Sequence, residues 1–127
     1  MSSSKRIAAI ITFCVALLCA FSVLAQTAAG VDSLKRVDAK YTCFVTKHLF
    51  AKVQHPVAIE GKTYYGCCQM CNTKLKNDPA LRYDTDPVSG NKVNKADAII
   101  GVDDQGRIYF FENEQDFKKF RPTADTN

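Results

Sequence analysis

Sulfur-bearing side chains are concentrated in one short stretch, residues 64–71, which read Tyr-Tyr-Gly-Cys-Cys-Gln-Met-Cys. Cys67, Cys68 and Cys71 lie there with one methionine, and Cys43 lies upstream of them. If a helix begins at the glycine, Cys67 and Cys71 stand one turn apart on one face, and both sulfurs can reach one ion. Cys68 then points about 100° away around the helix axis. The stretch therefore predicts a soft-metal site or a redox site.

Residues 1–25 have the pattern of a secretory signal peptide. Lys5 and Arg6 precede an apolar run, residues 7–24, and small residues at the end of this run provide a cleavage site after Ala25. The alternative is a retained membrane anchor, but a run of this length is at the short end of what spans a bilayer. We therefore expect a periplasmic or secreted protein that has no membrane contact once the leader is cleaved.

The chain without its leader has the size of one domain, about 102 residues. Fifteen basic and thirteen acidic residues remain and are interspersed, so neither nucleic acid nor an anionic membrane surface is an expected partner. Cys14 and Cys19 leave with the leader, and four cysteines remain. Four cysteines in an exported protein ordinarily predict two disulfides.

The first half of this domain predicts a hairpin followed by a helix. Residues 26–40 are polar at first and then place Val31, Leu34 and Val37 at three-residue spacing, which permits a short helix. The other elements expected are a strand at 41–45 carrying Cys43, an edge strand at 53–59 crossed by Pro56, a turn at Glu60-Gly61, a strand at 62–65, and a helix from the cysteine cluster to residue 77 that ends at Asp78-Pro79.

The second half repeats the order of hairpin and helix without any cysteine. The elements expected are a turn at 86–90, strands at 98–102 and 107–111, a helix at 112–120 that stops before Pro122, and a tail at 123–127. The sequence thus predicts an α+β fold with ββα units in tandem, one at 41–84 and one at 85–122.

The two halves can be aligned at their aromatic pairs. Placing residues 65–67 over 110–112 aligns Cys71 with Asp116 and brings Cys43 within one residue of Ser89. Internal duplication explains this alignment, and a chance likeness of two short units is the alternative.

Residues 64–71, with the Asp78-Pro79 that follows, resemble the Tyr-Tyr-Phe-Cys-x-x-x-Cys core and trailing Asp-Pro of the TRASH/YHS family. Cys43 fits the first cysteine of that pattern. The resemblance implies small treble-clef-like domains associated with trafficking, resistance and sensing of heavy metals. The stretches 86–90 and 106–111 are similar to a second YHS unit, in which Ser89 stands where a cysteine is expected and Glu112 replaces the next. The resemblance implies that this degenerate unit does not bind metal in the same way.

Thiolates are soft ligands that suit Cu(I) and Zn(II), and the N-terminus of a helix lowers the pKa of Cys67 and Cys68. We expect Cys43, Cys67 and Cys71 to be the ligands, with Cys68 and Met70 as accessory donors. The fourth donor is left open between these two residues, His48 and His55. Met70 would favour copper because a thioether is soft, and a histidine would favour zinc.

The cysteines also permit two functions other than metal binding. Cys68 and Cys71 form a Cys-x-x-Cys that would suit thiol-disulfide exchange, and two disulfides would suit an interaction module. No motif of a hydrolase, a phosphate-binding loop or a metalloprotease is present, so we expect no enzyme. We expect an exported protein that binds, buffers or hands over a soft metal, with copper favoured over zinc. The resemblance implies an envelope metal transporter or carrier as its partner.

Overall fold

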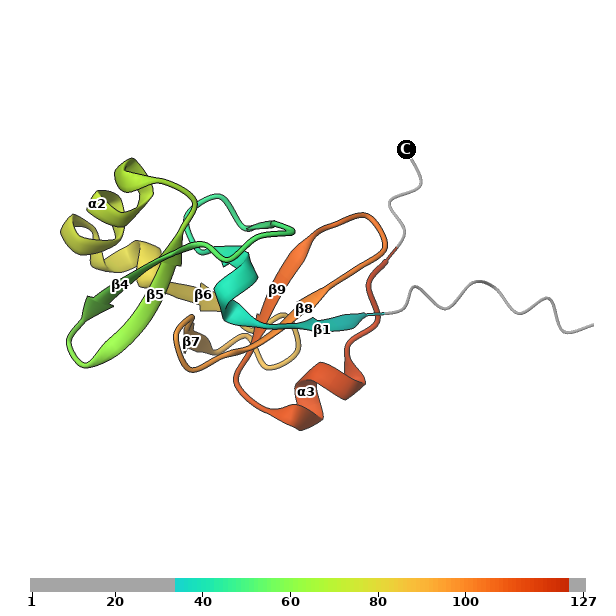
Figure 1. The fold of residues 1–127 in the computed structure, drawn as a ribbon. Helices are drawn as coiled ribbons and strands as arrows, with labels where there is room; N and C mark the ends of the chain where they lie inside the picture. Colours follow the sequence, from blue (N-terminus) through green and yellow to red (C-terminus); the bar gives the residue numbers. More distant parts are fainter. Residues whose placement is uncertain (1–33, 124–127) are drawn as a thin grey trace, which may run out of the picture. The chain divides into compact units, whose positions relative to one another are not determined.

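A computed structural model describes residues 34–123 (Figure 1). The predicted leader, residues 1–25, and the end of the tail, residues 124–127, lie outside the described residues. The described part has two α-helices and several small sheets, which confirms a mixed α+β fold. None of the helices in this part is long and apolar enough to cross a bilayer. The elements belong to one unit, residues 31–127, and the domain boundary near residue 84 stays a prediction.

The helices and strands follow one another in an order that repeats. After strand β1 and a 3-10 turn come two hairpins and a helix, and then two further hairpins and a helix. The elements are β1 (Lys35–Val37), η2 (Ala39–Tyr41), β2 (Thr42–Cys43), β3 (His48–Leu49), β4 (His55–Ile59), β5 (Lys62–Gly66), α2 (Gln69–Asn77), η3 (Pro79–Arg82), β6 (Tyr83–Thr85), β7 (Lys92–Asn94), β8 (Ile99–Val102), β9 (Ile108–Phe111) and α3 (Glu114–Lys119).

The β4–β5 hairpin has the predicted place and turn. Glu60 and Gly61 both have positive φ, 53° and 76°, as the two central residues of a tight two-residue hairpin turn require. Pro56 lies in β4, which pairs only with β5, so its missing N–H removes no bond from a central strand. This hairpin ends at Gly66, directly before the cysteine cluster.

The prediction of a short helix within residues 31–37 is wrong for those of its residues that the structure describes. Lys35–Val37 form β1, which pairs antiparallel with β8 in a three-stranded sheet of order β1-β8-β9. Leu34 lies over Gly101 of β8, where an added Cβ would come within 2.8 Å of the leucine side chain. The hydrogen-bonding partner is more than sixty residues away, so local apolar spacing could not reveal it.

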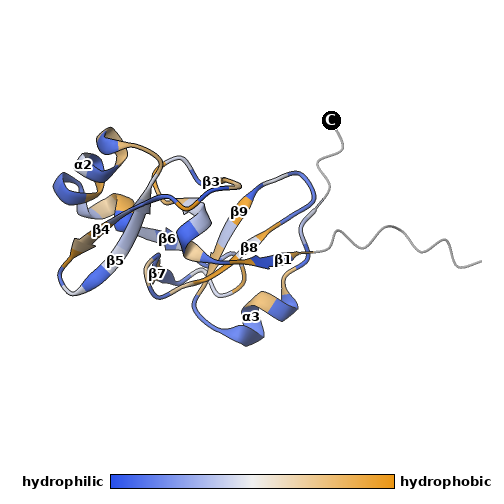
Figure 2. Cartoon of the chain, viewed as in Figure 1, coloured by the Kyte–Doolittle hydropathy of each residue, from blue (hydrophilic) through white to orange (hydrophobic). Residues whose placement is uncertain are grey.

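The second half confirms the expected hairpin and helix. The β8–β9 turn contains Gly106 with φ 80°, and α3 begins after Asn113, whose side chain accepts a hydrogen bond from the Asp116 N–H. Phe117 and Phe120 lie against Phe111 of β9, both with ring centroids 5.5 Å away. Figure 2 shows α3 mostly hydrophilic, with one hydrophobic stretch. The β6–β7 hairpin was expected only as a turn.

The core joins the two halves through aromatic rings. Phe44, next to Cys43, is fully buried and makes edge-to-face contacts with three rings. Its centroid lies 6.2 Å from Tyr64, 5.9 Å from Tyr65 and 5.7 Å from Phe110 of the second half. Buried Leu75 of α2 belongs to the same cluster. The residue that follows Cys43 is therefore an anchor of the whole core.

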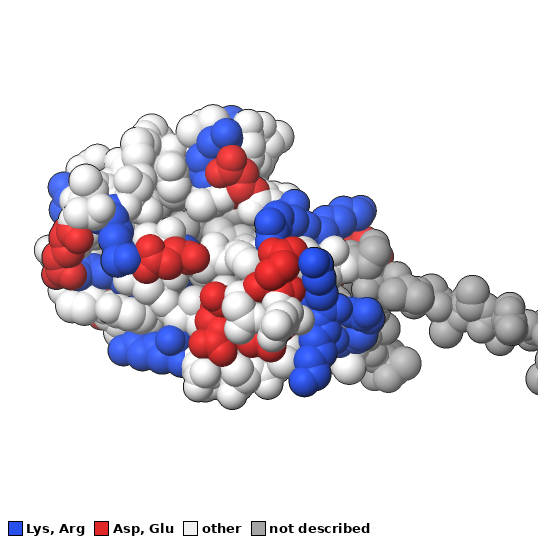
Figure 3. All heavy atoms as spheres, turned by 90° about the horizontal axis from the view of Figure 1, so that it is seen from below, with Lys and Arg blue, Asp and Glu red and all other residues white. Residues whose placement is uncertain are grey.

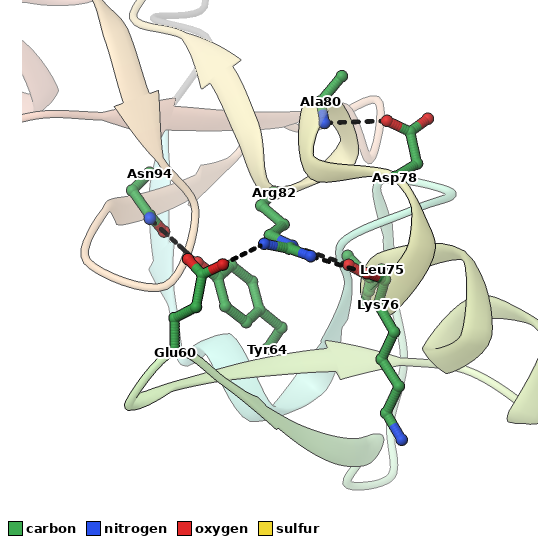
Figure 4. A network of polar contacts seen from close by, with 8 residues as sticks. All are labelled: Glu60, Tyr64, Leu75, Lys76, Asp78, Ala80, Arg82 and Asn94. Atoms are coloured by element: carbon green, nitrogen blue, oxygen red, sulfur yellow. Dashed lines mark hydrogen bonds and ion pairs between the residues drawn. The ribbon is translucent and has the colours of Figure 1, made fainter.

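One arginine fixes the C-terminal end of α2 (Figure 4). Arg82 donates to the carbonyl oxygens of Leu75 and Lys76, each at 2.8 Å, and to the Glu60 carboxylate at 3.2 Å. The last carbonyls of a helix have no partner within it, so these bonds satisfy groups that would otherwise need water. They also tie the C-terminal end of α2, the helix that carries Cys71, to the β4–β5 turn.

Candidate metal centre

The structure brings together three sulfur atoms from three separate elements. The Sγ atoms of Cys43, Cys67 and Cys71 all lie within 4.8 Å of one another, and those of Cys67 and Cys71 are 3.6 Å apart. Cys43 and Cys71 are buried and Cys67 is half-buried. All four described cysteines are free thiols. Such a group has the spacing and the donor type to hold one soft metal ion.

Cys67 does not lie on the helix, contrary to the expectation from its spacing. α2 begins at Gln69, and Cys68 is its N-cap with an extended backbone, φ −159° and ψ 171°. Cys71 lies in the first turn of the helix, and Cys67 follows the end of β5. The two sulfurs still meet because the chain reverses direction at the cap rather than because they share a helix face.

A glycine makes this reversal possible. A Cβ at Gly66 would lie 2.3 Å from the side-chain oxygen of Asn72 and 2.9 Å from the Cβ of Cys71. Contacts that short are not tolerated, so only glycine lets β5 approach the first turn of α2 this closely. The TRASH/YHS motif that residues 64–71 resemble has phenylalanine at this position, where this chain has glycine.

Backbone groups converge on the sulfur of Cys43. Burial raises the pKa of this thiol, but the Thr46 hydroxyl and the N–H groups of Thr46, Cys67 and Val45 outweigh burial and bring the pKa down to about 7. The Lys47 N–H also donates to the Cys43 carbonyl at 2.9 Å, which closes the turn between β2 and β3. The turn therefore favours the thiolate form of Cys43. The sequence prediction did not include Thr46. Its position, three residues after Cys43, is the signal that could have indicated a hydrogen bond to that sulfur.

The other thiols differ in their tendency to ionise. Burial and then the sulfurs of Cys67, Cys68 and Cys43 raise the pKa of Cys71 to about 12. The Cys71 thiol lowers the pKa of Cys67, but partial burial and the other sulfurs outweigh it and raise that pKa, against expectation. Cys68 has a lowered pKa, chiefly because the Cys71 N–H at the helix start stabilises its thiolate. A metal that binds Cys67 and Cys71 must therefore displace protons.

The accessory donors lie around this group rather than in it. Cys68 is exposed, and Met70 is 66% exposed on the first turn of α2. His48 and His55 are exposed as well, and neither belongs to the group of ligand atoms within 4.8 Å. His48 pairs with Cys43 across β2 and β3 and lies against Phe50, with ring centroids 5.0 Å apart. The structure thus brings three sulfurs together, leaves the Cys68 thiol exposed at their edge and places both histidines outside the group.

A buried ammonium group lies behind the site. Lys95 donates to the carbonyl of Phe44 at 2.8 Å and to that of Leu81 at 3.1 Å, and its nitrogen is 3.7 Å from the Asp84 carboxylate. Burial lowers the pKa of Lys95, and the Asp84 charge opposes this shift. The contact holds the residue next to Cys43 against the second half. Nothing in the sequence around Lys95 indicates this role.

A second group of ligand-type side chains has the same layout in the second half. Carboxylate oxygens of Asp86, Glu112 and Asp116 lie within 4.8 Å of one another. The Gly90 N–H donates to the Asp86 carbonyl at 2.9 Å, as the Lys47 N–H donates to that of Cys43. Gly90 and Lys47 also share a positive φ, 75° and 52°. The two turns therefore have one geometry with different ligand-type residues.

The counterpart of Cys43 in this geometry is Asp86, so the expected pairing near Ser89 is wrong. The Asp86 carboxylate accepts bonds from the N–H groups of Val88 at 2.8 Å, Ser89 at 3.3 Å and Glu112 at 2.8 Å. The Cys43 sulfur takes the same set from Val45, Thr46 and Cys67. The alignment failed because the second half has two more residues between these positions, and a register without gaps cannot accommodate them.

Asp86→Asn should destabilise the protein by about 2 kcal/mol, because a buried carboxylate that accepts three N–H bonds becomes an amide whose nitrogen meets a donor. Urea denaturation measures this loss. Asp97→Asn is the matched control, since Asp97 makes an exposed ion pair with Lys62 and its loss should have a much smaller effect. Equal losses of stability in the two variants would show that the hydrogen bonds of the Asp86 carboxylate do not hold the turn against the end of β9.

Comparisons with protein-family models, with curated proteins and with solved structures find no match for this chain.

Proposed function

We propose that the protein binds a soft metal ion through the thiolates of Cys43, Cys67 and Cys71. The observation that supports this most directly is the approach of their three sulfurs to within 4.8 Å of one another. Two of these sulfurs are buried. Binding of one ion by all three thiols explains their convergence better than three cysteines that are buried independently as core residues. The role that follows is to bind, buffer or hand over the metal.

Copper(I) suits this group better than zinc. Three thiolates complete a trigonal Cu(I) site, whereas zinc in proteins takes four ligands in nearly every structural site. The fourth thiol, Cys68, is exposed at the edge of the group, and the nearby thioether of Met70 is a donor for copper rather than zinc. Both histidines, which would favour zinc, are outside the group.

For the fold, the proposal is that the two halves are tandem treble-clef-like units. The repeated order of two hairpins and a helix supports it, as do the matching turns at Cys43 and Asp86. Only the first unit keeps thiols, so the second serves as a packing partner. This arrangement agrees with the resemblance to the TRASH/YHS family, which depends on the residue pattern alone.

The proposed setting is the cell envelope or the exterior, and the proposed role is not enzymatic. The leader-like pattern of residues 1–25 supports export. A metal transporter or another metal carrier of the envelope would be the partner. Export matters for the chemistry because the free thiols must meet the metal before they meet an oxidant.

Metal analysis and thiol titration of protein purified without reductant test the proposal. One bound ion per chain is expected, and removing it with a chelator should expose titratable thiols. Protein with neither ion nor free thiols would support the disulfide-stabilised module instead. A reduction potential in the range of exchange catalysts, with exchange activity that survives Cys43→Ser, would support the redox alternative.

A further inference from the structure

The sulfur donors become steadily more exposed from one side of the metal centre to the other. Cys43 and Cys71 are buried, Cys67 is half-buried, and Cys68 is exposed. Met70, two residues further on, is 66% exposed and is one of only three large apolar side chains in residues 34–123 that are exposed. The centre is therefore closed on the Cys43 side and accessible where α2 begins.

The segment that carries the four cysteines contains more basic than acidic residues. Residues 43–77 contain five lysines and one glutamate, which are Lys47, Lys52, Lys62, Lys74, Lys76 and Glu60. Glu60 and Lys62 lie at the turn end of the β4–β5 hairpin, away from Cys67, where Glu60 bonds to Arg82 and Lys62 pairs with Asp97; Lys47 pairs with Asp84. No carboxylate from this segment lies next to the opening.

Two lysines of α2 have no ionic partner in the part of the chain that the structure describes. Lys74 and Lys76 are exposed, and neither forms an ion pair within residues 34–123. Lys74 follows Met70 by four residues, so the two side chains lie on one face of the helix, one turn apart. Lys74 thus lies on the same face of α2 as the exposed thioether of Met70, one turn further along the helix.

The second half shows a different pattern of charge. In α3, Lys118 pairs with Glu114, one turn away, and Asp116 lies in the first turn. The face seen in Figure 3 carries acidic and basic side chains close together. Lys74 and Lys76 thus differ from Lys118 of α3, which has an acidic partner one turn away.

We propose that the protein exchanges its metal ion with an acidic carrier protein that docks on the outer face of α2 and reaches the ion through Cys68. This inference rests on the proposed function. The partner needs thiolate or thioether donors and surrounding carboxylates, because complementary charge speeds the encounter of two proteins and orients it. Lysines also offset the repulsion between two sets of anionic thiolates as they approach.

The exchange needs no oxidant or reductant. The Cys68 thiol loses its proton and forms a sulfur–metal bond as the bond to half-buried Cys67 breaks, and a thiol of the carrier then loses its proton and replaces Cys68. Each sulfur that leaves the metal takes up the proton that its replacement released. The metal keeps its oxidation state, and the buried sulfurs of Cys43 and Cys71 hold it until the carrier has supplied its own ligands.

Transfer to two synthetic peptides tests this inference. Both peptides carry a Cys-x-x-Cys pair and a fluorophore that Cu(I) quenches, and one is flanked by glutamates while the other is flanked by lysines. From Cu(I)-loaded protein at low salt, transfer to the glutamate peptide should be about 10-fold faster, and high salt should abolish the difference. Equal rates for the two peptides at low salt would overturn the docking surface.

Variants separate the steps. Lys74→Gln with Lys76→Gln should slow transfer to the glutamate peptide about fivefold, whereas the matched pair Lys118→Gln with Lys119→Gln on α3 should not. Cys68→Ser should slow transfer to both peptides about 10-fold. Unchanged rates in Cys68→Ser, or equal slowing by the two lysine pairs, would contradict the inference. Protein that takes up no Cu(I) at the loading step would instead show that the proposed function fails.

Discussion

Replacing Cys43 with serine should lower the affinity for Cu(I) by about 100-fold or more, or roughly 3 kcal/mol. Cys43 supplies one of three convergent sulfurs and is the only one that comes from outside residues 64–71. Its loss leaves Cys67 and Cys71, two donors on adjoining pieces of chain. A hydroxyl is a poor ligand for a soft ion and cannot replace the thiolate. Competition with a Cu(I) chelator of known affinity measures the change.

Cys68→Ser is the matched thiol replacement, and we expect it to lower the affinity by less than about 10-fold because Cys68 lies outside the group of three sulfurs. A thermal melt of each metal-free variant checks that the fold is intact. Serine can still accept the N–H groups that bond to the Cys43 sulfur, so Cys43→Ser should fold. Equal affinity of Cys43→Ser and the unmodified protein would remove Cys43 from the ligand set.

Truncation of Phe44 to alanine should destabilise the protein by about 4 kcal/mol. This ring is fully buried, belongs to the cluster that joins the two halves, and makes three edge-to-face contacts, each of which adds to the loss from the cavity. Domains of this size have about 5–15 kcal/mol of stability in total, so a large part would be lost. Urea denaturation followed by tyrosine fluorescence measures the change in midpoint.

Phe44→Leu keeps most of the buried volume and should cost about 1–2 kcal/mol, so the difference between the two variants reports the cavity. We also expect Phe44→Ala to weaken metal binding, because the cavity would loosen the packing next to the bond from the Phe44 N–H to the Tyr65 carbonyl, which holds Cys43 beside β5. If both variants unfold at the same urea concentration, Phe44 is not the anchor of this core.

Local patterns determined much of the fold. The Glu60-Gly61 turn, the strands on either side of it, the end of α2 before Pro79 and the β8–β9 hairpin were all predictable. Each depends on residues only a few positions apart, because glycine, proline and the period of apolar residues act on the nearest backbone. The same patterns named Cys43, Cys67 and Cys71 as one set, since thiols are few and their chemistry is specific.

Tertiary contacts decided the rest. Lys35–Val37 became a strand because β8 offered a partner, and Cys67 left the helix because Gly66 lets β5 pack on the first turn of α2. Whether buried Lys95 bonds to Phe44 cannot be known until distant segments meet.

The sequence by itself determined which residues can hold a soft metal, because that depends on side-chain chemistry. Only the tertiary structure decided that three sulfurs meet and that Asp86 occupies the place of Cys43 in the second half. Those outcomes depend on hydrogen bonds and close contacts between segments more than twenty residues apart. No local preference of the chain encodes them.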